Sequence, residues 1–196
     1  MLPYNMNKKL KAEMLELNEA YIQVQRWFFA YPNREIGLND LSGGLGISKT
    51  TAKRIVLDFV DDGFLKREIL GKVWRISCNQ NHLYNHTRKI SYNLELVYES
   101  NILQAIHEII PNPRSITLFG SYRKGDDIER SDVDIAVETV GNDDVRVVKL
   151  GVIPQFGYRK NVTVNLYIFS RNKVDLNLFA NIANGIVLEG FLEARP

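Results

Sequence analysis

Residues 118–137 are LFGSYRKGDDIERSDVDIAV, and this stretch decides how the second half of the chain is interpreted. The apolar run that ends at Phe119 predicts a buried strand, so Gly120 and Ser121 would lie just past its end, at the start of a turn or short helix. Backbone N–H groups are free at such a position, glycine permits close approach, and serine adds a hydroxyl. The Gly-Ser pair therefore favours binding of phosphate oxygens.

The same stretch ends in two aspartates. Residues 132–137 predict a strand in which side chains two apart share a face, so Asp132 and Asp134 would lie side by side, on the order of 6.6 Å apart along the backbone. Two carboxylates held this close to an apolar sheet are costly unless a cation lies between them. Mg²⁺ suits the pair, because it takes oxygen ligands and completes its shell with water and nucleotide phosphates.

Together, the Gly-Ser pair, its ten-residue spacer and the Asp-Val-Asp motif resemble the signature of the DNA polymerase beta-like nucleotidyltransferase superfamily. Gly125 falls where that superfamily often has a second glycine. The resemblance implies that the Gly-Ser pair holds a nucleoside triphosphate and that both aspartates hold Mg²⁺, while an acceptor hydroxyl attacks the α-phosphate and pyrophosphate leaves. Arg123 and Lys124 either contact the β- or γ-phosphate or are solvated loop charges.

Active members of the superfamily usually supply a third carboxylate from a neighbouring strand. The strand predicted over residues 161–169 has Asn165 where this acid is expected. An amide brings no negative charge and is no useful base. Three alternatives follow: one metal suffices, a separate helical protein or second subunit supplies the missing group, or the domain binds nucleotide without turning it over.

The first part of the chain predicts three helices and a hairpin, at residues 17–31, 38–44, 49–61, 64–69 and 73–77. Ser48 is the expected N-cap of the third helix, and Gly71-Lys72 is the expected hairpin turn. This order, and the segment DLSGGLGISKTTAKRIVLDFVDDGFLKRE at residues 40–68, resemble a winged helix-turn-helix domain.

In DNA-binding winged helices, the helix after the turn enters the major groove and the wing touches the backbone. The resemblance implies DNA contacts from six residues: Lys49, Thr50, Lys53 and Arg54 on the helix, and Lys72 and Arg75 on the wing. A solvated face and a protein-docking module are the alternatives. Residues 1–78 carry 12 Lys+Arg against 9 Asp+Glu, which is a small excess of positive charge for a domain whose DNA affinity depends on phosphate contacts.

We therefore expect an α+β chain, with a winged helix-turn-helix domain at 1–80, a junction at 81–92 and a nucleotidyltransferase domain at 93–196. Beyond the motif stretch, its small mixed sheet backed by helices would include a long helix over 94–110, an apolar segment at 145–152, a helix at 172–184 and an apolar run at 186–188. Cys78 is alone, and neither an apolar signal core nor an 18-residue apolar run occurs. We expect a cytoplasmic protein without a membrane partner.

Two functions are compatible with these features. The first is Mg²⁺-dependent transfer of an NMP group, AMP by default, to a hydroxyl of a protein, an RNA or a small molecule. The alternative is a transcriptional regulator that binds duplex DNA and carries a catalytically degenerate, nucleotide-binding nucleotidyltransferase domain.

Overall fold

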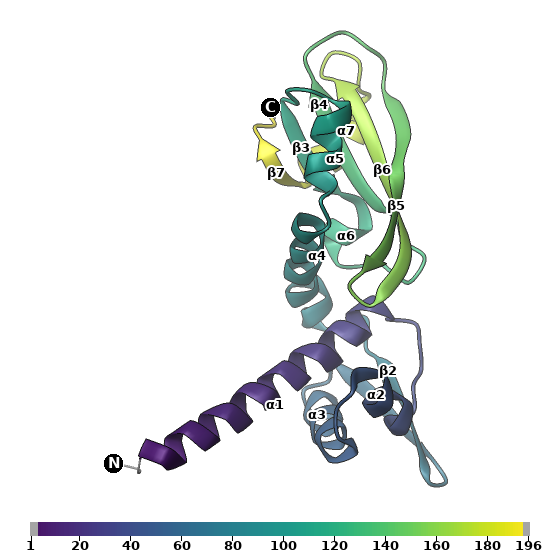
Figure 1. Cartoon of the computed structure of the whole chain (residues 1–196). Helices are drawn as coiled ribbons and strands as arrows, with labels where there is room; N and C mark the ends of the chain where they lie inside the picture. Colours follow the sequence, from purple (N-terminus) through teal and green to yellow (C-terminus); the bar gives the residue numbers. More distant parts are fainter. Residues whose placement is uncertain (1–3, 194–196) are drawn as a thin grey trace. The chain divides into compact units, whose positions relative to one another are not determined.

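The computed structural model describes the backbone of residues 4–193 and the side chains of residues 17–193. The chain divides into two compact units, residues 1–84 and 85–196 (Figure 1). The division falls inside the segment 81–92, where the sequence predicts a junction.

The N-terminal unit has three helices followed by a hairpin: α1 (Tyr4–Ala30), α2 (Leu38–Leu45), α3 (Lys49–Asp61), β1 (Leu65–Leu70) and β2 (Val73–Cys78). Ser48 caps α3, because its side chain accepts a hydrogen bond of 3.0 Å from the backbone N–H of Thr51. The buried face of α3 consists of Ala52, Ile55, Val56 and Phe59.

The first helix is longer than expected, because it begins at Tyr4 and not near Leu17. The intervening sequence is rich in Lys, Glu, Leu, Met and Ala, which are good helix formers, and it contains no Gly or Pro. Its high polarity hides the apolar periodicity on which the sequence prediction rested.

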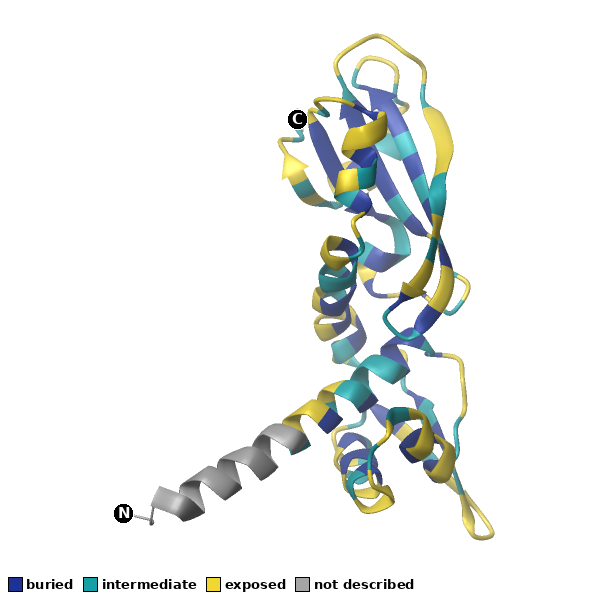
Figure 2. Cartoon of the chain, in the orientation of Figure 1, coloured by how far each residue is buried: buried dark blue, intermediate teal, exposed yellow. Residues whose placement is uncertain are grey.

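The C-terminal unit is built on a five-stranded sheet with the order β5-β6-β4-β3-β7. Strands β4 and β6 run parallel and the other neighbours run antiparallel, so the sheet is mixed, as expected. Its strands are β3 (Ser115–Phe119), β4 (Val133–Thr139), β5 (Arg146–Phe156), β6 (Arg159–Ser170) and β7 (Ile186–Gly190). Figure 2 shows that the inner strands are largely buried, whereas β5 is an exposed edge.

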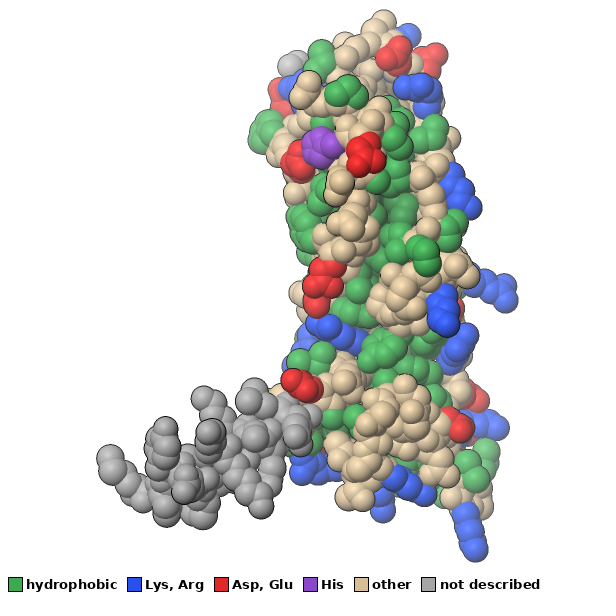
Figure 3. Space-filling view, viewed as in Figure 1, with side chains coloured by type: hydrophobic (Ala, Val, Ile, Leu, Met, Phe, Trp, Pro, Cys, Tyr) green, Lys and Arg blue, Asp and Glu red, His purple; other side chains and the backbone are tan. Residues whose placement is uncertain are grey.

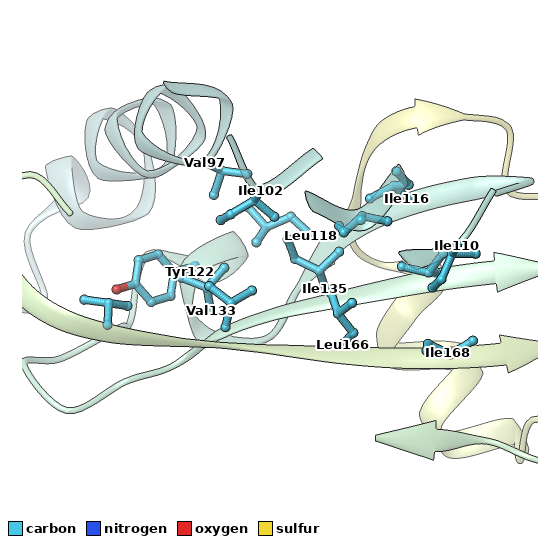
Figure 4. Close-up of a cluster of buried hydrophobic side chains, with 14 of the residues drawn as sticks. Val97, Ile102, Ile110, Ile116, Leu118, Tyr122, Val133, Ile135, Leu166 and Ile168 are labelled. Atoms are coloured by element: carbon cyan, nitrogen blue, oxygen red, sulfur yellow. The ribbon is translucent and has the colours of Figure 1, made fainter. Parts of the chain in front are cut away.

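Helices cover both faces of this sheet. On one face, Val97, Ile102 and Ile106 of α4 (Arg88–Glu99) and α5 (Ile102–Ile109) belong to the main core with inner-strand side chains such as Ile135 and Leu166 (Figure 4). On the other face, Ile182 and neighbouring side chains of α7 (Leu176–Ala183) form a second cluster.

One expectation for this unit was wrong. The single helix expected over 94–110 is two helices, because Asn101 takes a left-handed conformation with φ 58° and ends the run of helical hydrogen bonds. The apolar segment expected at 145–152, for which the sequence predicted no type of element, lies almost wholly in the 11-residue strand β5, which forms a hairpin with β6. None of the helices in the described residues has the length and apolar character needed to cross a bilayer.

Candidate functional site

Two carboxylates and one amide meet where β4 begins. In the parallel pairing of β4 with β6, Asp134 lies opposite Asn165, and Asp132 precedes the strand by one residue. The amide nitrogen of Asn165 donates to Oδ2 of Asp132 and to Oδ1 of Asp134, at 3.3 Å in both cases. Both aspartates therefore direct an oxygen at one point, the amide nitrogen of Asn165.

The Gly-Ser pair borders this cluster. Gly120 and Ser121 open the short helix α6 (Gly120–Lys124), and Phe119 lies opposite Asp134 in the β3–β4 register. Gly120 has φ 72°, and a Cβ on it would lie 2.8 Å from Oδ2 of Asp134. Glycine is therefore required here on two grounds, backbone conformation and close approach to the carboxylate.

Burial sets the electrostatics of the cluster. The pKa of Asp134 is raised above its ordinary value, mainly by desolvation and further by repulsion from Asp132, while the hydrogen bond from Asn165 opposes the rise. Burial also raises the pKa of Tyr167, and both aspartates add to this effect. Tyr167 packs edge-on against Phe119, with ring centroids 4.9 Å apart, so a neutral aromatic wall borders the carboxylates.

The described residues bring no three His, Cys, Asp or Glu side chains together as a metal site. The cluster offers two carboxylates and one amide. Its chemistry nevertheless fits Mg²⁺, because Asp132 and Asp134 converge on one point and this ion takes its remaining ligands from water and phosphate. Rotation of the Asn165 side chain would present its oxygen in place of its nitrogen, so the amide is compatible with a bound cation.

A buried polar network anchors the spacer between the two motif halves, and the sequence prediction missed it. The Lys89 ammonium lies 3.3 Å from Oδ1 of Asp127, to which Asn93 donates at 2.8 Å. Arg159 holds the end of the spacer by donating to the carbonyl oxygen of Ser131 at 2.6 Å. Lys89, Asn93, Asp127 and Arg159 are almost fully buried, so they fix the loop that leads from the phosphate turn to Asp132.

The spacer cations lie at the end of α6. Arg123 is partly exposed and Lys124 is exposed, and neither forms an ion pair with any side chain in the described part of the chain. Gly125 ends the helix with φ 77°, and a Cβ there would lie 1.8 Å from the carbonyl oxygen of Asn85. Phosphate contact by the two cations stays a prediction.

A third cation, which sequence reasoning missed, lies on the edge strand. Lys149 of β5 is directly opposite Asn165 in the antiparallel β5–β6 register. No motif marks this lysine, and the register of β5 cannot be read from its apolar sequence. Only strand pairing brings Lys149 beside the carboxylates.

Three of the six residues predicted to contact DNA come together in the N-terminal unit. Lys49, Lys53 and Lys72 line a depression of about 270 Å³ that also contains Trp74. The Lys53 ammonium lies 5.8 Å from the centre of the Trp74 ring. On the face shown in Figure 3, Lys and Arg side chains project from the lower end of this unit.

The other three predicted DNA contacts lie elsewhere. Thr50 and Arg54 line a second depression, of about 500 Å³. Arg75 is engaged by two acids, with Glu35 at 3.3 Å and Glu68 at 3.8 Å. The second depression leaves two of these residues accessible, whereas ion pairing weakens the case for Arg75 as a phosphate contact.

Comparison with known proteins bears on the C-terminal unit. No curated protein matches the chain. Residues 99–186, which contain the Gly-Ser pair, both aspartates and Asn165, match the family model described as a nucleotidyltransferase domain. This match supports a nucleotidyltransferase domain within the C-terminal unit, and with it a general nucleotidyl-transfer function.

Proposed function

We propose that the C-terminal unit transfers an NMP group, with AMP as the default, from a nucleoside triphosphate to a hydroxyl acceptor. The observation that carries the proposal is the convergence of Asp132, Asp134 and Asn165 beside Gly120. Phosphoryl chemistry of this kind depends on positioning and on charge neutralisation, and the cluster provides both. The family-model match to residues 99–186 supports the same reaction class.

The chain's own residues have separate tasks in this proposal. Gly120 lets the backbone approach the phosphates, and Ser121 offers them a hydroxyl. Asp132 and Asp134 would hold Mg²⁺, which supplies Lewis-acid neutralisation of charge on the attacking and leaving oxygens when it is bound. Asn165 fixes the orientation of both carboxylates. It accepts no proton, so the acceptor hydroxyl loses its proton to another group or to solvent.

The proposal is tested with α-labelled ATP, CTP, GTP and UTP, offered with Mg²⁺ to the full-length protein and to host lysate. We expect label on an acceptor from wild-type protein and none from an Asp132→Asn, Asp134→Asn double variant. An Asp143→Asn, Asp144→Asn variant is the matched control, because it removes two exposed carboxylates from the same unit. Equal labelling by both double variants would overturn the proposed reaction.

A second candidate function is DNA binding by the N-terminal unit. The order of its three helices and hairpin supports a winged helix, and the depression lined by Lys49, Lys53 and Lys72 offers three cations to a phosphate backbone. We then expect Lys53→Ala to reduce the salt dependence of duplex DNA binding by about one unit of slope. Lys66→Ala, which removes an exposed lysine from β1, is the control and should leave the slope unchanged.

The two candidate functions predict different partners. The enzyme requires a nucleoside triphosphate, and a separate helical protein or second subunit would complete its substrate site. The regulator requires duplex DNA, with nucleotide as a signal. Label transfer in the absence of DNA binding would select the first.

A further inference from the structure

Lys149 is the cation closest in strand register to the proposed site. It faces Asn165 across the β5–β6 pair, and Asn165 faces Asp134 across the β6–β4 pair. Residues directly opposite one another in an antiparallel pair have Cβ atoms about 4.5–5.5 Å apart and share a face of the sheet. Lys149, Asn165 and Asp134 therefore form one row across three strands.

Packing on the opposite face confirms this orientation. The preceding residue, Val148, lies opposite Leu166, which belongs to the main core. Successive side chains along a strand point to opposite faces. Lys149 therefore projects from the face that carries the carboxylates, on a flexible four-carbon stem.

The ammonium of Lys149 is not paired with another side chain of the described residues. Lys149 is exposed, and among the described side chains it has neither an ion-pair nor a hydrogen-bond partner. A carboxylate at position 165 would lie opposite this ammonium and pair with it, as opposite charges in cross-strand register do. Because position 165 is an amide, the positive charge stays available for a ligand.

The positive charge of Lys149 suits an anionic ligand, and its size can be compared with the charge that a second metal ion would bring. A third carboxylate with a second divalent metal contributes −1 and +2, a net charge of +1. The amide of Asn165 with the ammonium of Lys149 contributes 0 and +1, which is the same sum. The substitution of an amide for an acid therefore leaves the charge presented to the nucleotide unchanged, provided that the lysine faces it.

We propose that Lys149 binds a nonbridging oxygen of the transferred phosphate and takes the place of the second metal ion. This inference rests on the nucleotidyl-transfer function proposed above. The ammonium supplies positive charge where negative charge develops during the reaction, and it forms no covalent bond. With Asn165 and Lys149 in these positions, the site would need only the one metal ion held by Asp132 and Asp134.

The test uses the full chain with MgATP and a fixed amount of host lysate as the source of the acceptor, and it compares Lys149→Ala and Lys149→Gln with Lys160→Ala. Lys160 is the matched control, because it is an exposed lysine on the same hairpin that pairs with Gln155 and lies five residues before Asn165 on β6. We expect both Lys149 variants to lower kcat/KM for pyrophosphate release on the order of 100-fold, and the control to match wild type. Equal rates for Lys149→Ala and Lys160→Ala would refute the role of Lys149.

A second metal should be able to replace the lysine. Adding Asn165→Asp to Lys149→Ala restores a metal-binding acid, so we expect the rate to recover at high Mg²⁺ and to depend on two metal ions. An unchanged rate at every Mg²⁺ concentration would refute the exchange of lysine for metal.

Binding separates failure of this inference from failure of the proposed function. In calorimetry with MgATP, Lys149→Ala should bind about tenfold more weakly than wild type, even if no acceptor is present. Binding that is lost in Asp134→Asn but unchanged in Lys149→Ala refutes the lysine alone. If wild-type protein binds no MgATP, the proposed function fails and this inference fails with it.

Discussion

Replacement of Asn165 by aspartate gives a quantitative test of the site. The amide nitrogen lies 3.3 Å from one oxygen of Asp132 and 3.3 Å from one oxygen of Asp134. A carboxylate oxygen in the same place would repel each neighbour by about 1.3 kcal/mol even with the dielectric constant of water, or about 2.5 kcal/mol in total. Attraction from Lys149, which lies opposite, offsets up to about 1 kcal/mol.

The net repulsion of about 1.5 kcal/mol destabilises the metal-free variant and is relieved when a cation binds. Since about 1.4 kcal/mol corresponds to a factor of ten in affinity, Asn165→Asp should bind Mg²⁺ at least about tenfold more tightly than wild type.

The assay is thermal unfolding in EDTA and across a series of Mg²⁺ concentrations, because a ligand that binds only the folded state raises the unfolding midpoint by an amount that grows with the logarithm of its concentration divided by Kd. Asn161→Asp is the control, since it makes the same substitution at an exposed position of the same strand. If Asn165→Asp is as stable as wild type in EDTA and gains nothing from Mg²⁺, position 165 does not face the two carboxylates.

Three further predictions follow from the contacts. In metal-free protein, carbon-detected NMR should show that Asp134 keeps its proton to a higher pH than an ordinary aspartate. Asn165→Ala should raise the pKa of Asp134 further, because a hydrogen bond that favours the charged form is lost, and a lower pKa in this variant would contradict the prediction. Gly125→Ala should destabilise the C-terminal unit by at least about 2 kcal/mol in denaturant unfolding, because the φ of 77° and a Cβ 1.8 Å from a backbone oxygen are both unfavourable. An unchanged free energy of unfolding would exclude the tight turn. Lys89→Met leaves buried Asp127 without its cation, so it should lower the free energy of opening that controls amide exchange in β3 and β4 by about 3–5 kcal/mol. A decrease of less than about 1 kcal/mol would show that the pair is not buried.

The parts of the molecule that sequence predicts well are those fixed by local physics. The strand that ends at Phe119, the turn at Gly120 and the strand that carries Asp134 depend on apolar runs and on glycine, whose effects act over a few residues. The capping of α3 by Ser48 is local in the same way.

The parts that sequence does not predict depend on contacts between distant segments. Lys149 lies beside Asn165 only because β5 pairs with β6 in one register, and an exposed edge strand carries little pattern to fix that register. Lys89 is buried because Asp127, which is far along the chain, neutralises it. The break at Asn101 lies within an otherwise continuous apolar stripe, so periodicity gave no sign of it.

The most direct test of the central claim is MgATP binding, because it needs no knowledge of the acceptor. Calorimetry should show that wild-type protein binds ATP with Mg²⁺ and binds it far more weakly in EDTA. The Asp132→Asn, Asp134→Asn variant should lose the metal-dependent part, whereas Asp143→Asn, Asp144→Asn should retain it. Metal-independent binding of equal strength in all three proteins would contradict a nucleotide site built on Asp132 and Asp134.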